Sequence, residues 1–153
     1  MRGGIQGQAE GLSRPVTARA WSATVPVTIT IRKEHDFLRV IYRGEEDLES
    51  EMGLEAALLK AIKEHDCHKL LHDCRAVTGS RLGTLDCFTV AGSYDRRFLP
   101  IRSALLDHAE HYRENRFWET TVRNQGFTTK VFNDEKEAVV WLLDEDEQCR
   151  EQI

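Results

Sequence analysis

The sequence predicts an α/β domain with a mixed sheet of about five strands and four helices. Two strand-like segments follow one another at the start of the pattern, separated by a short polar turn, and helical and strand periodicity then alternate. A short turn joins antiparallel strands, whereas strands that alternate with helices pair in parallel through right-handed crossovers. The length of 153 residues fits one domain.

The first two strands are predicted from their alternation. From Val25 to Ile31, every second residue is apolar and β-branched, which indicates a strand with one buried face. The segment Phe37–Arg43 is the second strand, and residues 34–36 form the polar turn before it. A connection this short cannot cross over the sheet, so the two strands should form an antiparallel hairpin.

The middle of the chain predicts two helices around a short strand. Apolar residues spaced three or four apart predict a helix over residues 47–65, with a buried face made of Leu48, Met52, Ala56, Leu59 and Ile62. Residues 69–74 are a strand, followed by turn residues at 78–80. A second helix is predicted over residues 84–98, with Leu85, Phe88, Ala91 and Phe98 at helical spacing, and Pro100 prevents its continuation.

The remaining elements complete the alternation. Residues 101–106 form a strand, and the helix over residues 114–125 ends at Gly126. Residues 127–132 are the last strand. Asp134 and Glu137 have the spacing of a capping box, which predicts a final helix that buries Ala138, Trp141 and Leu142.

Residues 25–144 are therefore the predicted domain, between an N-terminal tail at 1–24 and an acidic C-terminal tail at 145–153. Hydrophobic residues make up 41% and charged residues 31% of the chain, as in a soluble globular protein. The net charge of -5 argues against a nucleic-acid partner. No apolar run approaches the roughly 18 residues that span a membrane.

The cysteines and the first residues predict a cytoplasmic protein. The four cysteines form no C-x-x-C pair, and a disulfide framework is expected mainly in small secreted chains. The first residues contain no apolar segment of the kind found in a secretory signal. We therefore expect a reducing compartment and buried, unpaired thiols.

Three segments resemble the STAS fold, and in particular its SpoIIAA-like branch. These are Leu70–Cys74, Ala104–Asp107 and Thr129–Leu142, and the likeness covers about residues 27–143. In proteins of this fold a central strand ends in an aspartate, and the chain closes with a strand and a helix containing Ala and Trp-Leu. The resemblance implies a non-catalytic regulatory module that binds a partner protein or a small ligand.

The founding members of that family are antagonists of anti-sigma factors, and phosphorylation of a serine in an Asp-Ser-x-Gly motif switches them. This sequence departs from the motif, because residues 73–85 contain no Asp-Ser pair. Ser80 and Thr84 place hydroxyl groups in the corresponding region without the motif around them. The resemblance therefore implies a binding module that lacks this phospho-acceptor.

A ligand or anion rim is predicted where two parallel strands end. Ligands of open α/β sheets bind beyond the carboxyl ends of the strands, and a helix that begins after a glycine-containing loop offers free N–H groups to an anion. The alternative is an ordinary turn in which Thr84 caps the helix. The rim consists of Asp73, Thr78, Gly79, Ser80, Gly83, Thr84, Asp107, His108, His111 and Tyr112.

No cofactor, metal site or catalytic motif is predicted. The residues His65, Cys67, His68, His72 and Cys74 suit zinc chemically, but their spacing does not form a closed set of four ligands. The chain has no G-x-S-x-G elbow and no Walker loop. A hydrolase that uses Asp73 with His108 or His111 is the remaining enzymatic alternative.

A carrier of a small apolar or lipid ligand is the second functional hypothesis, because the CRAL-TRIO lipid-transfer proteins have a related fold. It predicts a cavity lined by the helices at 84–98 and 114–125, to which Phe88, Phe98, Phe117 or Trp118 is exposed. Contact with a membrane surface and a homodimer stay open as further forms of association.

Overall fold

The computed structural model describes residues 25–144, and the two predicted tails lie outside the described residues. One sheet of five strands has the order β1-β2-β3-β4-β5. Its strands are β1 (Thr28–Glu34), β2 (Phe37–Glu45), β3 (Lys69–Thr78), β4 (Arg102–Leu106) and β5 (Thr128–Phe132). Strands β1 and β2 are antiparallel and the other neighbours are parallel, so the predicted mixed sheet is confirmed.

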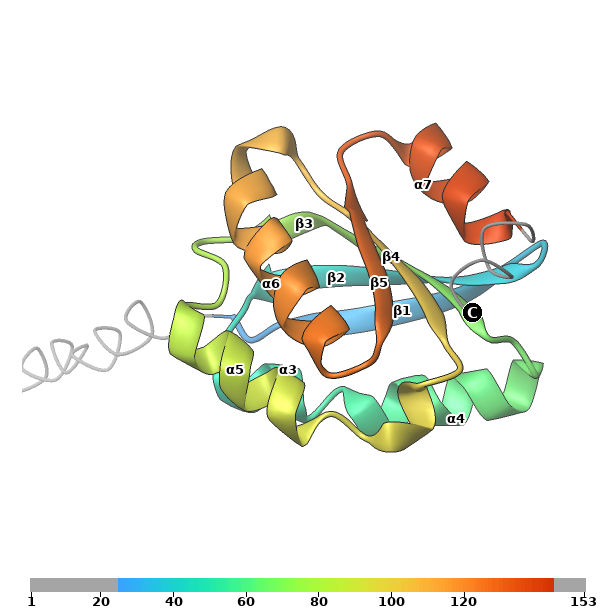
Figure 1. The fold of residues 1–153 in the computed structure, drawn as a ribbon, viewed down its shortest axis with the longest axis horizontal. Helices are drawn as coiled ribbons and strands as arrows, with labels where there is room; N and C mark the ends of the chain where they lie inside the picture. Colours follow the sequence, from blue (N-terminus) through green and yellow to red (C-terminus); the bar gives the residue numbers. More distant parts are fainter. Residues whose placement is uncertain (1–24, 145–153) are drawn as a thin grey trace, which may run out of the picture.

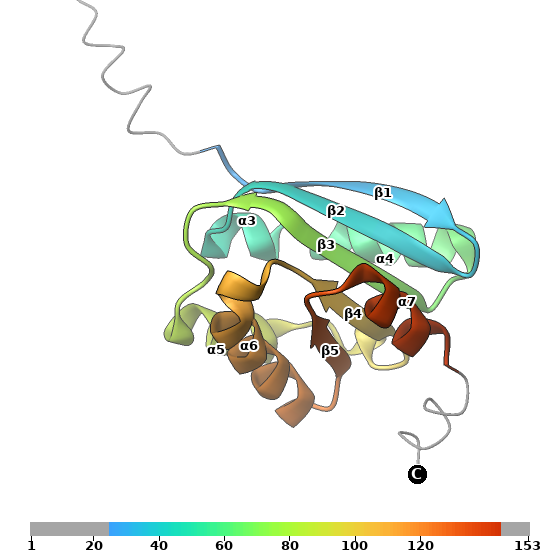
Figure 2. The same ribbon diagram turned by 90° about the horizontal axis from the view of Figure 1, so that it is seen from above.

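The helices form two layers on opposite faces of this sheet. Because the sheet grows in one direction from β2 to β5, right-handed crossovers place every connecting helix on the same face. Figure 1 shows α3, α4 and α5 on one side of the sheet and α7 on the other, and Figure 2 shows α7 beside β4 and β5. The bounds are α3 (Leu48–Met52), α4 (Glu55–His65), α5 (Thr84–Ser93), α6 (Tyr112–Asn124) and α7 (Glu135–Leu143), with 3-10 turns η1 (Arg96–Phe98) and η2 (Ala109–His111).

Each layer has its own apolar core. On the face of the connecting helices, Leu58, Ala91 and Val122 pack with buried residues of β2 and β3. On the other face, Leu71 and Leu106 lie under α7, whose buried residues are Ala138, Trp141 and Leu142. The Asp134 side chain accepts a hydrogen bond from the Glu137 backbone N–H at 3.0 Å, so the predicted start and buried face of this helix are confirmed.

The predicted helix over residues 47–65 is two helices. Gly53 is the C-cap of α3, and α4 begins two residues later. The interruption changes the direction that later side chains face, so Ala56 is exposed, and Met52, the last residue of α3, is exposed as well. The buried residues of α4 are Leu58, Ala61 and Ile62.

The predicted helix over residues 84–98 also divides. Helix α5 ends at Ser93 because Tyr94 has an extended backbone, and η1 is a separate turn capped by the Asp95 side chain. Cys87, Val90 and Ala91 form the buried face of α5. The predicted apolar face is therefore only partly buried: Ala91 and Phe98 are buried, but Leu85 and Phe88 are exposed.

Candidate functional site

The two strands expected to end side by side do so. Strands β3 and β4 are parallel neighbours with a continuous register from the Lys69–Arg102 pair to the Asp73–Leu106 pair. Strand β3 then continues alongside β2 to Thr78. The loops after β3 and β4 therefore lie at one edge of the sheet, and Asp73 lies inside a strand, not at its end.

Asp107 ties the two loops together. Its carboxylate is 1% exposed and accepts two hydrogen bonds from Arg81, through Nε and Nη2, at 2.9 Å each. Asn115 Nδ2 donates to it at 2.9 Å and the His108 backbone N–H donates at 2.8 Å. Four donors fill the acceptor positions of a carboxylate, so Asp107 holds the edge together and has no acceptor left for a ligand.

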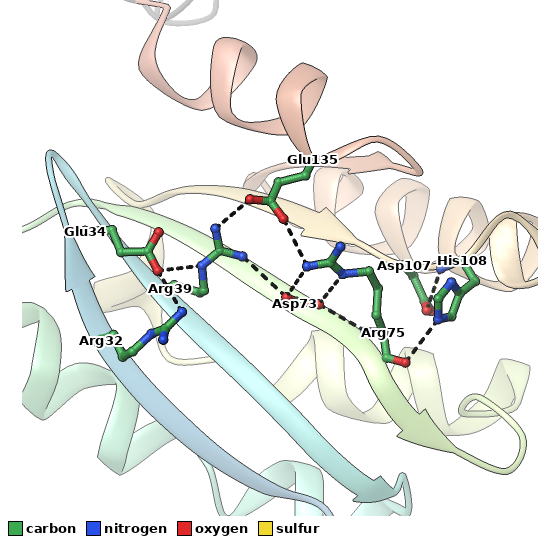
Figure 3. A network of polar contacts seen from close by, with 8 residues as sticks. All are labelled: Arg32, Glu34, Arg39, Asp73, Arg75, Asp107, His108 and Glu135. Carbon is green, nitrogen blue, oxygen red and sulfur yellow. Dashed lines mark hydrogen bonds and ion pairs between the residues drawn. The ribbon is translucent and has the colours of Figure 1, made fainter.

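Asp73 belongs to a different network on the face that carries α7. Figure 3 shows the Asp73 carboxylate facing Arg75 and Arg39, with Glu135 at the start of α7 joining both guanidinium groups. Arg75 donates to both carboxylate oxygens at 2.9 and 2.7 Å. Glu135 accepts from Arg39 at 2.9 Å and from Arg75 at 3.0 Å.

This network keeps Asp73 ionised. Burial would raise the pKa of Asp73, but the hydrogen bonds from Arg75 and the charge of Arg39 outweigh burial and hold it below its ordinary value. A hydrogen bond between His108 Nε2 and the Arg75 carbonyl, at 3.1 Å, links this network to the edge. The structure thus places Asp73 apart from the other residues of the predicted rim.

The remaining rim residues surround the start of α5. All five are exposed: Thr78 ends β3, Gly79, Ser80 and Gly83 lie in the loop that follows, and Thr84 is the first residue of α5. The N-cap of α5 is Gly83 and makes no side-chain hydrogen bond, so the alternative in which Thr84 caps the helix is wrong. The Leu82 N–H donates to Glu46 Oε2 at 3.1 Å, which anchors the loop to the segment after β2.

The two histidines of the rim lie at the two ends of η2, in the segment after β4. His108 precedes η2 and bonds the Arg75 carbonyl, whereas His111 ends η2 and precedes Tyr112, the first residue of α6. Their side chains are therefore in different surroundings. Arg81, which joins the two loops, was missed by the sequence reasoning, and only its place in the loop after β3 could have suggested it.

Two large apolar side chains are exposed where α5 begins. Leu85 is 80% exposed and Phe88 is 56% exposed. The Phe88 ring makes an edge contact with the ring of Phe117 on α6, with centroids 5.6 Å apart. We call Leu85 and Phe88 the α5 patch, and it adjoins the loop that Arg81 and Glu46 hold.

A cavity of about 80 Å³ lies between the sheet and helices α3, α5 and α6. Phe98 and Trp118 line it as the carrier hypothesis predicts, but Phe88 and Phe117 are not among the residues that line it. The remaining lining residues are Tyr42, Glu46, Glu51, Leu70, His72, Cys74, Arg81, Leu82, Cys87, Tyr94, Ile101, Ser103, Leu105, Glu114, Asn115, Phe127 and Thr129.

His72 forms the polar floor of this cavity. Its Nδ1 lies 2.7 Å from the Tyr42 hydroxyl and its Nε2 lies 3.2 Å from the Ser103 hydroxyl. Burial lowers the pKa of His72 to about 4, so the imidazole is neutral near pH 7. A histidine with this pKa is a weak proton acceptor beside Ser103, because general bases work best with a pKa near the working pH.

The carboxyl groups at the cavity behave differently from Asp73. Burial raises the pKa of Glu46, although the backbone hydrogen bond from Leu82 opposes this effect. Burial, followed by the charges of Glu46 and Asp47, raises the pKa of Glu51 to about 8. Among residues 25–144, no group of three or more histidine, cysteine, aspartate or glutamate residues is placed to hold a metal ion.

Comparisons with known proteins bear on the fold. No protein-family model and no curated protein matches the sequence. The structure is similar to an anti-sigma factor antagonist from Mycobacterium paratuberculosis, with 15% identity, a TM-score of 0.52, and coverage of 77% of this chain and 95% of that one. It is also similar to an uncharacterised Shewanella loihica protein with a SpoIIAA-like fold. The identity is 20%, the TM-score is 0.48, and the alignment covers 78% of this chain and 95% of that one.

The first of these similarities confirms the predicted STAS-like, SpoIIAA-like fold. No helix of the described part of the chain is long and apolar enough to cross a membrane.

Proposed function

Because the chain has this fold, we propose that it is a non-catalytic regulatory module that binds a partner protein at the edge of the sheet where α5 begins. The exposure of the α5 patch carries the proposal. Large apolar side chains that adjoin a rigid polar surface are typical of protein interaction sites. The surface beside the patch is rigid because Arg81 and Asp107 tie the loops after β3 and β4 together.

The chemistry of the buried groups supports a non-catalytic role. Asp107 is fully engaged, Asp73 is held ionised by arginines, and His72 is neutral and bonded on both ring nitrogens. The hydrolase hypothesis needs Asp73 beside His108 or His111, but the Asp73 carboxylate lies on the α7 face. None of these groups combines a suitable pKa with a free position next to a nucleophile.

The neighbour from Mycobacterium paratuberculosis supports a protein as the partner, because its name describes a protein that acts on an anti-sigma factor. Residues 73–85 contain no Asp-Ser pair, so we expect binding to occur without a phosphorylated serine of that motif. The buried, unpaired thiols of Cys67, Cys74 and Cys87 are consistent with a reducing cytoplasm.

The cavity supports a small ligand better than a lipid. A volume of about 80 Å³ corresponds to roughly five to eight water molecules. An acyl chain needs more room than this, and several carboxyl groups line the cavity. The cavity therefore favours a ligand of a few heavy atoms, which is compatible with partner binding at the α5 patch.

Site-specific photo-crosslinking tests the proposal. The photoreactive residue p-benzoylphenylalanine replaces Phe88, and the protein is irradiated in the cells from which it comes. We expect a discrete adduct with one partner protein, because the side chain at position 88 lies at the proposed interface. Leu85→Asp in the same chain should abolish the adduct, since a carboxylate within the α5 patch opposes apolar contact.

The matched control carries the same photoreactive residue at Val140. Val140 is 69% exposed, as Phe88 is exposed, but it lies on α7 on the other face of the sheet. Adducts of equal yield from positions 88 and 140, or an adduct that survives Leu85→Asp, would contradict the proposed interface.

A further inference from the structure

We propose that the cavity between the sheet and helices α3, α5 and α6 binds a small organic ammonium ion, with aromatic rings around its apolar part and glutamate carboxylates as counter-ions. This inference is independent of partner binding at the α5 patch. Three features of the cavity support it, namely its aromatic wall, its charge and an unsatisfied hydroxyl group.

The aromatic wall centres on Tyr94. Its ring stacks on Phe98 at a centroid distance of 5.1 Å and makes edge contacts with Phe127 at 5.2 Å and Trp118 at 6.0 Å. All four rings line the cavity. The negative faces of aromatic rings attract organic cations, and groups of such rings recognise ammonium ligands.

The charge of the cavity has the sign that suits a cation. Glu51 comes from α3, Glu46 from the segment after β2, and Glu114 from α6. Arg81 also lines the cavity, but its guanidinium is paired with Asp107, and its side chain is 3% exposed. The carboxyl groups therefore have no free cation beside them among the residues that line the cavity.

Within residues 25–144, the groups shown to interact with Glu51 carry no positive charge. Every titratable group shown to interact electrostatically with it is acidic or neutral near pH 7. These groups are Glu46 and Asp47 before α3, Tyr42 on β2, Cys74 on β3, Cys87 on α5 and Tyr94 after it. An ammonium ion in the cavity would supply the missing charge, and Glu51 would then release its proton.

Thr129 provides the third observation. It is 7% exposed and lines the cavity from β5. Its backbone carbonyl accepts a hydrogen bond from Arg123, but its hydroxyl makes no hydrogen bond to any residue of the described range. A buried polar group without a partner costs about 1–3 kcal/mol, so such groups are normally satisfied. The hydroxyl oxygen can accept a hydrogen bond from an ammonium N–H.

The size of the cavity limits the ligand. Room for roughly five to eight water molecules fits a primary amine of about five heavy atoms. Larger cations, such as a phospholipid headgroup with its acyl chains, exceed this volume. We therefore choose n-butylammonium as the probe, with 1-butanol and butyrate as neutral and anionic molecules of similar size.

Calorimetric and NMR titration of the full chain with each probe tests the proposal. We expect saturable binding of n-butylammonium, with shifts in the backbone amides of Glu51, Trp118 and Thr129. We expect at least about tenfold weaker binding of 1-butanol and no binding of butyrate, since a lost charge pair of about 1.4 kcal/mol corresponds to tenfold in affinity. Near pH 7 the heat should differ between buffers of different ionisation enthalpy, because Glu51 releases a proton.

Glu51→Gln should weaken n-butylammonium binding at least about tenfold and remove the buffer dependence of the heat, whereas Glu49→Gln, an exposed position on the same helix, should change neither. Thr129→Val removes the hydroxyl and keeps the shape of the side chain almost unchanged, so it should also weaken n-butylammonium binding. Any of three results would overturn the proposal. They are binding of butyrate or 1-butanol as strong as that of n-butylammonium, full affinity for n-butylammonium in Glu51→Gln, and no saturable binding of n-butylammonium by a folded chain. Photo-crosslinking from position 88 is unaffected by any of these results.

Discussion

The charge state of three buried or half-buried carboxyl groups depends on their neighbours. These groups belong to Asp73, Asp107 and Glu51. Arg75 and Arg39 surround the first, and Arg81 holds the second. The charges that act on Glu51 are those of two other acids, Glu46 and Asp47. The first two carboxylates are therefore held in charged form by arginine partners, whereas a charge on Glu51 would be unpaired in the cavity without a ligand.

The stability of the free protein should depend on Glu51 and on pH. The pKa of Glu51 is about 8 in the folded protein and about 4.3 for an unperturbed glutamate, so folding favours the protonated form. This contribution is fully present below about pH 4.3 and is lost as the pH rises through about 8, by at most about 1.4 kcal/mol per pH unit. Glu51→Gln removes it.

We therefore expect the free energy of unfolding of Glu51→Gln, relative to wild type, to increase by at least about 1 kcal/mol between about pH 5 and about pH 8.5. Urea unfolding at both pH values measures this difference. Glu49→Gln should show no such change. A constant difference between Glu51→Gln and wild type would mean that Glu51 is not a buried acid in solution.

At the scale of elements, two glycines have opposite roles. Gly53 joins α3 to α4 with right-handed helical backbone angles, φ -81° and ψ -8°. Gly44 in β2 has φ +103°, and a Cβ atom there would lie 2.5 Å from the Pro26 carbonyl oxygen. The first position can accept a side chain and the second cannot.

Gly53→Ala should raise the free energy of unfolding by about 0.4–1 kcal/mol, because alanine restricts the unfolded chain and fits this backbone. At position 53 a Cβ atom meets Ser50 O at 3.5 Å, an ordinary contact. Gly44→Ala should lower the free energy of unfolding by at least about 1 kcal/mol, because alanine at this position causes backbone strain and a close contact with Pro26. Urea denaturation of both variants checks the pair, and loss of stability in Gly53→Ala would show that the helix break needs glycine.

Local sequence patterns predicted the hairpin and the last helix because these depend on neighbours close in the chain, and the alternation of strands and helices predicted the parallel pairing of the other strands. The Asp134 cap and the buried Trp141 belong to one helix, and their spacing is enough to identify them. Periodicity failed at Gly53, where apolar spacing continues through a break in the helix. It also failed at Leu85 and Phe88, since α5 packs through Cys87, Val90 and Ala91.

The candidate site was less predictable because it depends on contacts between distant residues. The likeness to STAS proteins and the order of the strands located the edge of the sheet. The pair of Arg81 with Asp107 joins residues 26 positions apart, and no local pattern contains that contact. Because the last part of β3 contains polar residues, the predicted strand ended at Cys74 and was too short. Asp73 was therefore expected at the edge of the sheet, but it lies within the strand.

At the scale of the molecule, β3 joins the two cores. Leu70 faces the connecting helices and Leu71 faces α7, and both are fully buried. The strand pairs with β2 on one side and with β4 on the other. In contrast, β1 lies at the edge of the sheet and, among residues 25–144, pairs only with β2.

Because unpairing β3 opens both cores at once, we expect its central amides, at Leu70–Asp73, to exchange only through global unfolding. The amides of β1 and α3 should exchange through smaller openings. Native-state hydrogen exchange by NMR in increasing urea measures both: the exchange free energies of the β3 amides should follow the global unfolding curve throughout, and those of β1 should merge with it only near the midpoint. If the β3 amides exchanged as easily as those of β1, the two layers would unfold separately, and the sheet would not couple the α5 patch to the core under α7.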